Sequence, residues 1–351
     1  MLDRLPGPAG AVSRARLAGQ TIDLIADFPF TGGGLASFPG LHSHYILGIP
    51  FYYLPNGHNI ILDVTLEQGL LGALALLIII ATTFWFLLRQ NAKQTTAIHN
   101  PHMTLLTGAT LSSFLVLLLH GMVEDTVYGS AALPLLFVAP ALTHALSSAA
   151  PKSAIANCTT DKQRRAQVRR WHIRTAAVFG VAGLALLSTL IVPQGRATWW
   201  ANLGAVNMAR AQLADFPTGQ WAPSRQANTL QGAENLFQQS LYLNPQQHSA
   251  QYYMGLVDML DRDYDSAVRR LEVAYAQDPE HFGVRKALGY SYAWSGNVER
   301  GRELLDDLPF VSQELGAYVG WWRRQGRDDL AETAAELLTY FRSAGRQSVT
   351  E

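Results

Sequence analysis

Charge is scarce in this chain. Charged side chains make up 15% of its 351 residues, whereas about 25% is usual in a soluble protein. The 27 basic and 27 acidic residues cancel, so no net field favours nucleic acid or an acidic substrate. The deficit is concentrated between residues 69 and 193, while residues 194–351 have an ordinary soluble composition. The composition predicts a membrane-embedded part and no nucleic-acid partner.

Cysteine and an export signal are also lacking. Cys158 is the single cysteine, which excludes an internal disulfide and leaves the redox compartment undefined. Residues 1–19 do not contain the apolar core of a signal peptide. We therefore expect export to depend on internal apolar segments, or on sequence that precedes this chain.

Four long apolar runs are present, at residues 69–88, 104–123, 131–148 and 175–193. About 20 predominantly apolar residues cross a bilayer as a helix; the third run is short and holds two prolines. The alternative, four buried helices of a soluble protein, would need a very large core. The sequence thus predicts an all-α protein with a four-span membrane region over residues 69–193.

The residues between these runs predict the orientation. Lys and Arg outnumber acids in the loops 89–103 and 149–174, and short loops of this kind stay in the cytoplasm. A nucleic-acid patch is the alternative for the second loop, but its place between two spans argues against it. Residues 1–68 and the sequence after Pro193 are then expected on the outer side.

The tail repeats itself every 34 residues. A small residue, a bulky residue, a helix glycine and a final proline recur, in the sets Ala233, Ala267 and Gly301; Phe237, Leu271 and Leu305; Gly255 and Gly289; Pro245 and Pro279. This is the tetratricopeptide pattern, so residues 194–351 are predicted to form an α-solenoid with a concave face that binds protein partners. A plain helical bundle with chance periodicity is the alternative.

Residues 1–68 form a separate polar, turn-rich domain on this interpretation. Residues 15–28 have apolar side chains at helical spacing and suit an amphipathic helix on the membrane surface. His42 and His44 are interpreted as surface histidines, because no nearby cysteine or carboxylate cluster supplies further metal ligands.

The most specific motif is "HNIILDVTLEQGLLG", which starts at His58. His58 and Asn59 are followed after nine residues by Gly69 and then Gly72, with Glu67 ahead of the first glycine. This arrangement resembles the O-antigen ligase and polymerase superfamily of bacterial membrane glycosyltransferases.

The same family has an arginine about fifteen residues before a "P-x-T-G-x-G" turn. Arg14 stands at that distance from the turn that begins at Pro29. Ala18 replaces the tryptophan that often follows the arginine, and Arg16 is therefore a rival for the same role. Downstream, Asp125 lies where the family often has an acid near the outer face. The resemblance covers roughly residues 10–145.

The resemblance implies transfer of a glycan from undecaprenyl pyrophosphate to an acceptor hydroxyl, with inversion and without metal or cofactor. His58 would act as general base, and Arg14 or Arg16 would bind the pyrophosphate bidentately. Asn59, Glu67 and Asp125 would orient the imidazole or the donor, although a carboxylate at a helix start is as readily a capping group. The acceptor, a lipid, a glycan or a protein, stays open.

The resemblance also implies a bacterial inner-membrane protein, with the site and the repeats outside the cytoplasm. Family members have around ten to fourteen spans, so this chain would correspond to their C-terminal portion. The alternative is a non-catalytic membrane-anchored repeat scaffold, or a truncated inactive fragment.

Overall fold

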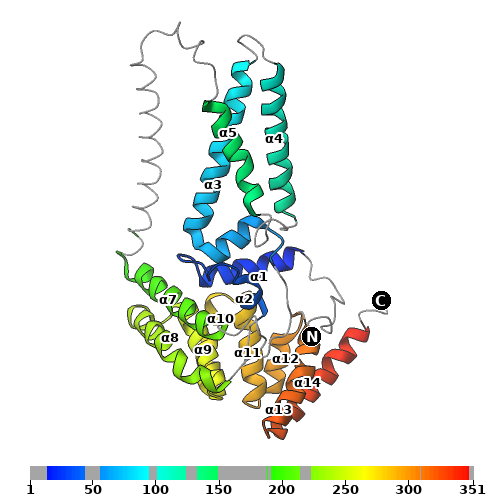
Figure 1. The fold of residues 1–351 in the computed structure, drawn as a ribbon. Coiled ribbons are helices and arrows are strands. Elements are labelled where there is room, and N and C mark those ends of the chain that lie inside the picture. Colours follow the sequence, from blue (N-terminus) through cyan, green and yellow to red (C-terminus); the bar gives the residue numbers. More distant parts are fainter. Residues whose placement is uncertain are drawn as a thin grey trace. The chain divides into compact units, whose positions relative to one another are not determined.

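Every regular element in the described part of the chain is a helix (Figure 1). The computed structural model describes residues 14–43, 56–94, 101–123, 133–148, 188, 191–213, 223–308 and 310–347. Contacts divide the chain into two compact units. Unit 1 comprises residues 1–57, 62–70 and 197–351, and unit 2 comprises residues 58–61 and 71–196. The expected all-α class is confirmed for the described residues.

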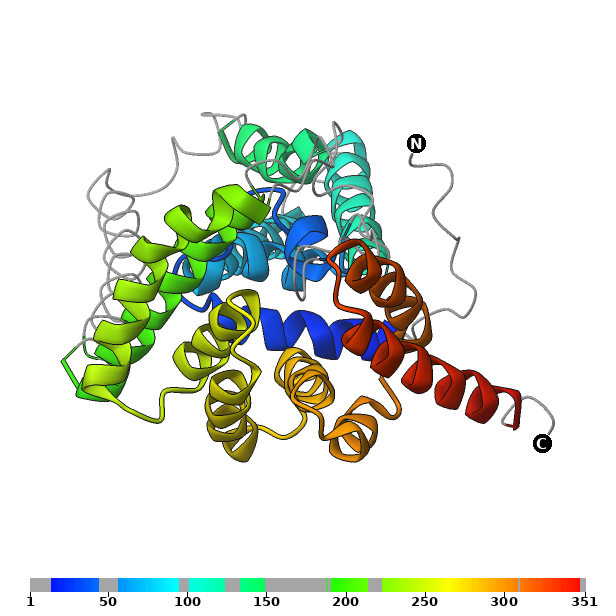
Figure 2. The same ribbon diagram turned by 90° about the horizontal axis from the view of Figure 1, so that it is seen from below.

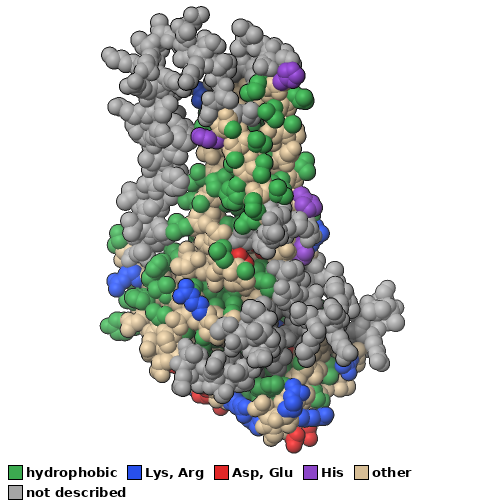
Figure 3. Space-filling view, in the orientation of Figure 1, with side chains coloured by type: hydrophobic (Ala, Val, Ile, Leu, Met, Phe, Trp, Pro, Cys, Tyr) green, Lys and Arg blue, Asp and Glu red, His purple; other side chains and the backbone are tan. Residues whose placement is uncertain are grey.

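Unit 2 contains the long apolar helices. Its elements are α3 (Ile60–Gln94, whose residues 62–70 belong to unit 1), α4 (Pro101–Gly121), the 3₁₀ helix η2 (Leu133–Phe137) and α5 (Val138–Ser148). Phe84 of α3 and Phe114 of α4 pack with ring centroids 5.3 Å apart. Many other apolar side chains point outward, among them Leu88 and Val116, which are 55% and 65% exposed. In Figure 3 hydrophobic side chains accordingly cover much of the surface of α3 and α4.

Two helices are long and apolar enough to cross a membrane, at Ile60–Gln90 and His102–Gly121. They coincide with the predicted spans 69–88 and 104–123. The predicted span 131–148 instead consists of η2 and α5, and its apolar helix, Leu133–Ala145, is shorter. Residues 175–193 lie outside the described residues, except for 188 and 191–193. Four spans therefore stay a prediction.

Four helix pairs make up the described C-terminal part of the chain, and all of it except residues 193–196 belongs to unit 1. They are α7 (Pro193–Leu213) with α8 (Pro223–Leu243), α9 (His248–Leu260) with α10 (Tyr264–Gln277), α11 (Phe282–Trp294) with α12 (Val298–Leu305), and α13 (Val311–Arg324) with α14 (Asp328–Gln347). The 34-residue period has a packing cause. A Cβ on Gly255 would lie 2.7 Å from the Leu271 side chain, and one on Gly289 would lie 2.8 Å from Leu305. Each glycine, because it has no side chain, thus lets the leucine of the next helix pack directly against its backbone.

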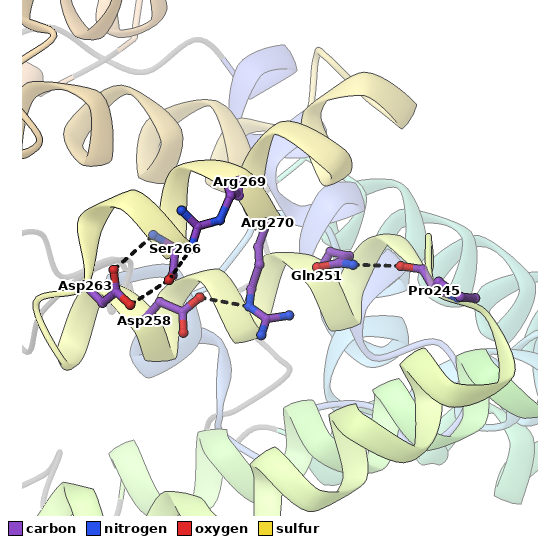
Figure 4. Close-up of polar contacts among 7 residues, drawn as sticks. All are labelled: Pro245, Gln251, Asp258, Asp263, Ser266, Arg269 and Arg270. Carbon is purple, nitrogen blue, oxygen red and sulfur yellow. Dashed lines mark hydrogen bonds and ion pairs between the residues drawn. The ribbon is translucent and has the colours of Figure 1, made fainter.

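Polar contacts fix the second pair (Figure 4). Asp263 caps α10, because its carboxylate accepts from the Ser266 backbone N–H at 3.1 Å and from the Ser266 hydroxyl at 2.6 Å. Arg270 of α10 donates to Asp258 of α9 at 2.8 Å. The cap satisfies an N–H that the helix leaves unpaired, and the ion pair joins the two antiparallel helices.

The N-terminal segment belongs to the same unit as the repeats. It contains α1 (Arg14–Asp27) and α2 (Phe38–Ser43), and in Figure 2 the four helix pairs curve around α1. The sequence predicts separate domains at residues 1–68 and 194–351, and contacts assign residues 1–57, 62–70 and 197–351 to unit 1. Leu17 and Leu24 of α1 are buried there, and Ile22 is 54% exposed. The apolar face of α1 thus packs against protein.

The interpretation of His42 as a surface histidine is wrong. The side chain is 6% exposed, its Nε2 lies 3.1 Å from Oε1 of Gln20, and its ring stacks on Phe38 at 5.5 Å. Burial, followed by the charge of Lys286, lowers its pKa to about 4. His42 is therefore a neutral core residue. His44 lies outside the described residues.

Candidate functional site

Backbone hydrogen bonds join the two glycine-bearing motifs. The N–H groups of Gly33 and Gly34 donate to the carbonyls of Leu66 and Glu67 at 2.8 and 3.0 Å. In the opposite direction, the N–H of Leu70 donates to the carbonyl of Pro29 at 2.9 Å. Residues 29–34 and 66–70 therefore form one interlocked element, although they are far apart in sequence.

Glycine is required on both sides of this element. Gly69 has φ 69° and ψ −176° inside α3, a backbone conformation essentially restricted to glycine. This kink interrupts the α3 hydrogen bonds and leaves carbonyls for the turn. A Cβ on Gly32, where φ is +68°, would lie 2.3 Å from the carbonyl carbon of Glu67. The motif glycines thus act by allowing two backbones to touch.

Glu67 caps the segment that leads into α2. Its carboxylate accepts from the backbone N–H of Ala36 at 2.9 Å and from that of Phe38, the first residue of α2, at 3.3 Å. The side chain is 6% exposed. Charge-assisted bonds of this kind at a helix N-terminus are stabilising. The structure therefore gives Glu67 a capping role, the alternative that the sequence left open.

His58 and Asn59 directly precede α3 and belong to unit 2. His58 is partly exposed and has φ +57°, a left-handed conformation that is uncommon for a residue with a side chain. Asn59 accepts from the N–H of Ile61 at 3.1 Å and donates to the carbonyl of Met122, after α4, at 3.2 Å. Asn59 thus fixes the start of α3 against the end of α4, next to a backbone-strained histidine.

Arg14 and Arg16 lie in the first turn of α1, in unit 1, and both are exposed. Cations at a helix N-terminus oppose the helix dipole, whereas an anion bound there is stabilised by it. Asp125 lies outside the described residues. Of the predicted site residues, unit 1 therefore holds Arg14, Arg16 and Glu67, and unit 2 holds His58 and Asn59.

Sequence reasoning missed how the glycine turn is held by the repeats. Phe28 is fully buried and packs edge-on against Tyr253 of α9, with ring centroids 6.4 Å apart. The next residues contact α7, because the N–H of Phe30 donates to Oδ1 of Asn202 at 3.0 Å and the amide of Asn202 donates to Thr31 at 2.8 Å. The repeats thus contact the glycine turn directly, through Phe28, Phe30 and Thr31.

Two carboxylates of α1 also face the repeats. Asp23 accepts from the N–H of Phe282, the first residue of α11, at 2.9 Å, and burial raises its pKa to about 6. Asp27 accepts from the hydroxyl of Tyr253 at 3.3 Å. Among the described residues, Asp27 with His248 and His281 is a group that could hold a metal ion. No metal was expected from the sequence, and these three residues have no shared spacing that would have identified them.

The tetratricopeptide repeat family model matches residues 258–318, from the end of α9 into α13. The tail therefore carries tetratricopeptide repeats, as its 34-residue period predicts. Neither the curated proteins nor the solved structures give a match. The resemblance to O-antigen ligases and polymerases rests on the motifs between residues 10 and 145 and stays a prediction.

Proposed function

We propose that the protein transfers a glycan from an undecaprenyl-pyrophosphate donor to an acceptor hydroxyl at the outer face of a bacterial inner membrane. The observation that carries the proposal is the interlock of residues 29–34 with residues 66–70. The resemblance depends on two motifs, the glycine turn at residues 29–34 and the motif that starts at His58. Two chance matches would not be expected to form hydrogen bonds with each other, so these bonds support the resemblance.

The proposed chemistry is an in-line displacement. The acceptor oxygen attacks the anomeric carbon while the bond from that carbon to the pyrophosphate oxygen breaks, which inverts the centre. His58 takes the proton of the hydroxyl, because a neutral imidazole can act as a general base. Arg14 stabilises the charge on the leaving pyrophosphate, with Arg16 as the alternative contact. No metal or cofactor takes part in this scheme.

The left-handed backbone of His58 sharpens the test of its role. Alanine at this position would add backbone strain, whereas asparagine tolerates positive φ and cannot act as a base at neutral pH. We therefore choose His58→Asn, with His102→Gln, an exposed histidine of α4, as the control. Glycan ligation or laddering is measured in a host that lacks its own enzyme, with the protein expressed from its native gene.

His58→Asn is expected to lower transfer by about 10²- to 10⁴-fold at unchanged protein level, and His102→Gln is expected to leave it unchanged. Arg14→Lys should also be severe, because an ammonium group cannot bind phosphate bidentately, and Arg16→Lys should be milder. Wild-type transfer by His58→Asn would refute the mechanism. The reverse order of the two arginine variants would move the pyrophosphate contact to Arg16.

The proposed orientation of the chain in the membrane can be tested separately. Cys158, the single cysteine, lies in the basic loop 149–174, outside the described residues. A membrane-impermeant maleimide is expected to label it only after the membrane is opened. Labelling in intact spheroplasts would reverse the orientation and exclude an extracytoplasmic site.

A membrane-anchored repeat scaffold is the second candidate, because tetratricopeptide repeats commonly bind protein partners. The match over residues 258–318 favours it. On this alternative, transfer by the wild type would be absent, and a protein partner would be retained in His58→Asn. Measuring glycan transfer and partner binding in the same two strains therefore distinguishes the two functions.

A further inference from the structure

Three residues with buried polar atoms lie close together where α1 meets the repeats. Among the described residues, no hydrogen-bond partner is found for Oδ1 of Asp27, Nε2 of His248 or Nε2 of His281. The residues come from the end of α1, the start of α9 and the residue before α11. Asp27 is 1% and His281 3% exposed. Buried polar atoms without partners are rare and call for an explanation.

The geometry is that of a metal site. The candidate ligand atoms of the three residues all lie within 4.8 Å of one another, and Oδ2 of Asp27 is 3.8 Å from Nε2 of His281. Bonds of about 2.0–2.2 Å in a tetrahedral zinc site separate neighbouring ligand atoms by roughly 3.3–3.6 Å. His248 is the least buried of the three, and the proposal requires its side chain to move until the ligands reach that separation.

The surrounding charge is also suitable. The group offers one carboxylate and two imidazoles as ligands. The nearby charged groups that act on it, Asp23 and Asp278, are acidic. Two imidazoles and one carboxylate favour zinc over magnesium or calcium, which prefer oxygen ligands alone.

We propose that Asp27, His248 and His281 bind a zinc ion that fastens α1 to α9 and α11. Three protein ligands leave one coordination position for water, as in other zinc sites with histidine and carboxylate ligands. The ion would bind the unpartnered atoms. Its binding free energy would stabilise the packing of α1 against α9 and α11. This role is structural and independent of the glycan-transfer proposal.

One contact of His281 opposes the ion. Its Nδ1 accepts from the N–H of Val284 at 3.2 Å as the cap of α11, so the neutral ring carries its proton on Nε2. Metal binding at Nε2 moves that proton to Nδ1 and breaks the cap. The free energy of one helix cap is small beside that of a structural zinc site. The conflict supplies a useful variant, because His281→Asn keeps a capping oxygen and removes the ligand nitrogen.

The test uses the full chain, purified in detergent without a histidine tag and treated with a chelator. Cobalt(II) and zinc(II) are then added to the wild type, Asp27→Asn, His248→Ala, His281→Asn and the control His102→Gln. We expect one cobalt per chain in the wild type, with the visible absorption of a four- or five-coordinate site that zinc displaces. Zinc should also raise the midpoint of thermal unfolding.

Each ligand variant should bind zinc at least about 100-fold more weakly, since even the loss of an outer contact to a metal ligand costs roughly 10- to 100-fold. His281→Asn should keep the wild-type helix content in circular dichroism, which separates ligand loss from misfolding. His102→Gln should behave as the wild type. Folded wild type without cobalt absorption would overturn the site, and so would wild-type zinc affinity in Asp27→Asn and His281→Asn; either result would leave a purely hydrogen-bonded cluster.

Discussion

A Cβ atom on Gly69 would lie 2.4 Å from the carbonyl oxygen of Phe30. This approach allows the kink in α3 to accept the glycine turn, and it joins the two motifs on which the proposed function depends. The contact is between two backbones, so these positions require the absence of a side chain.

Gly69→Ala should therefore destabilise unit 1 by about 3 kcal/mol or more, because it adds backbone strain and overlap with Phe30. Gly108→Ala is the matched control, since Gly108 lies inside α4 and a Cβ there meets nothing within 4 Å. Alanine is the better helix former, so this variant should be neutral or slightly stabilising. Thermal unfolding in detergent measures both. Equal midpoints for the two variants would contradict the interlock.

Phe28→Ala should cost about 3–5 kcal/mol, because it removes a fully buried ring and leaves a cavity beside Tyr253. Leu35→Ala provides the comparison, since Leu35 is 75% exposed and should change the free energy of unfolding by less than about 0.5 kcal/mol. Limited proteolysis of the full chain should also show earlier cleavage of α1 in Phe28→Ala. Unchanged protection would mean that α1 does not depend on the repeats.

Glu67→Gln should destabilise the protein by about 1–2 kcal/mol, because a neutral amide replaces a carboxylate that accepts from the N–H groups of Ala36 and Phe38. Glu303→Gln is the control. Glu303 pairs with Arg300 on an exposed surface, where such pairs contribute little. A larger effect of Glu303→Gln on the unfolding midpoint would contradict the capping role.

His42 should make stability fall in acid. Its pKa is about 4 in the folded protein and 6.5 when solvated, so between these values the unfolded chain binds more protons. The free energy of unfolding therefore decreases as the pH is lowered from about 7 to 4, by about 3 kcal/mol from this group. His42→Gln keeps a donor toward Gln20 and should remove that share. Chemical unfolding at several pH values compares the wild type, His42→Gln and His102→Gln, and parallel pH profiles for all three would exclude the effect.

The repeats were predictable because the residues that pack against each other within one helix pair lie close together in sequence. Gly255 and Leu271 recur one period later as Gly289 and Leu305, and each pair is a direct contact. The two long apolar helices were predictable for the same reason. The third predicted span was read from composition, and the structure has η2 followed by a short helix there.

The packing of α1 against the repeats was not predictable, because no sequence pattern in α1 identifies the helices that it contacts. Buried positions of α1 include Gln20, Thr21 and Asp27, which a hydrophobic pattern assigns to solvent. Their partners lie far along the chain, as in the contact of Asp27 with Tyr253. His42 was misplaced for a related reason, since its neighbour Gln20 belongs to another helix.

The joining of both flanks into unit 1 limits how the intervening chain can be threaded through a bilayer. Residues 62–70 and the repeats from residue 197 onward pack in one unit, so they must lie on one side of any membrane that the chain crosses between them. The number of crossings is then even. The two long apolar helices satisfy this parity by themselves. A crossing by residues 175–193 would require a second one from residues 131–148, and three crossings are forbidden by topology alone.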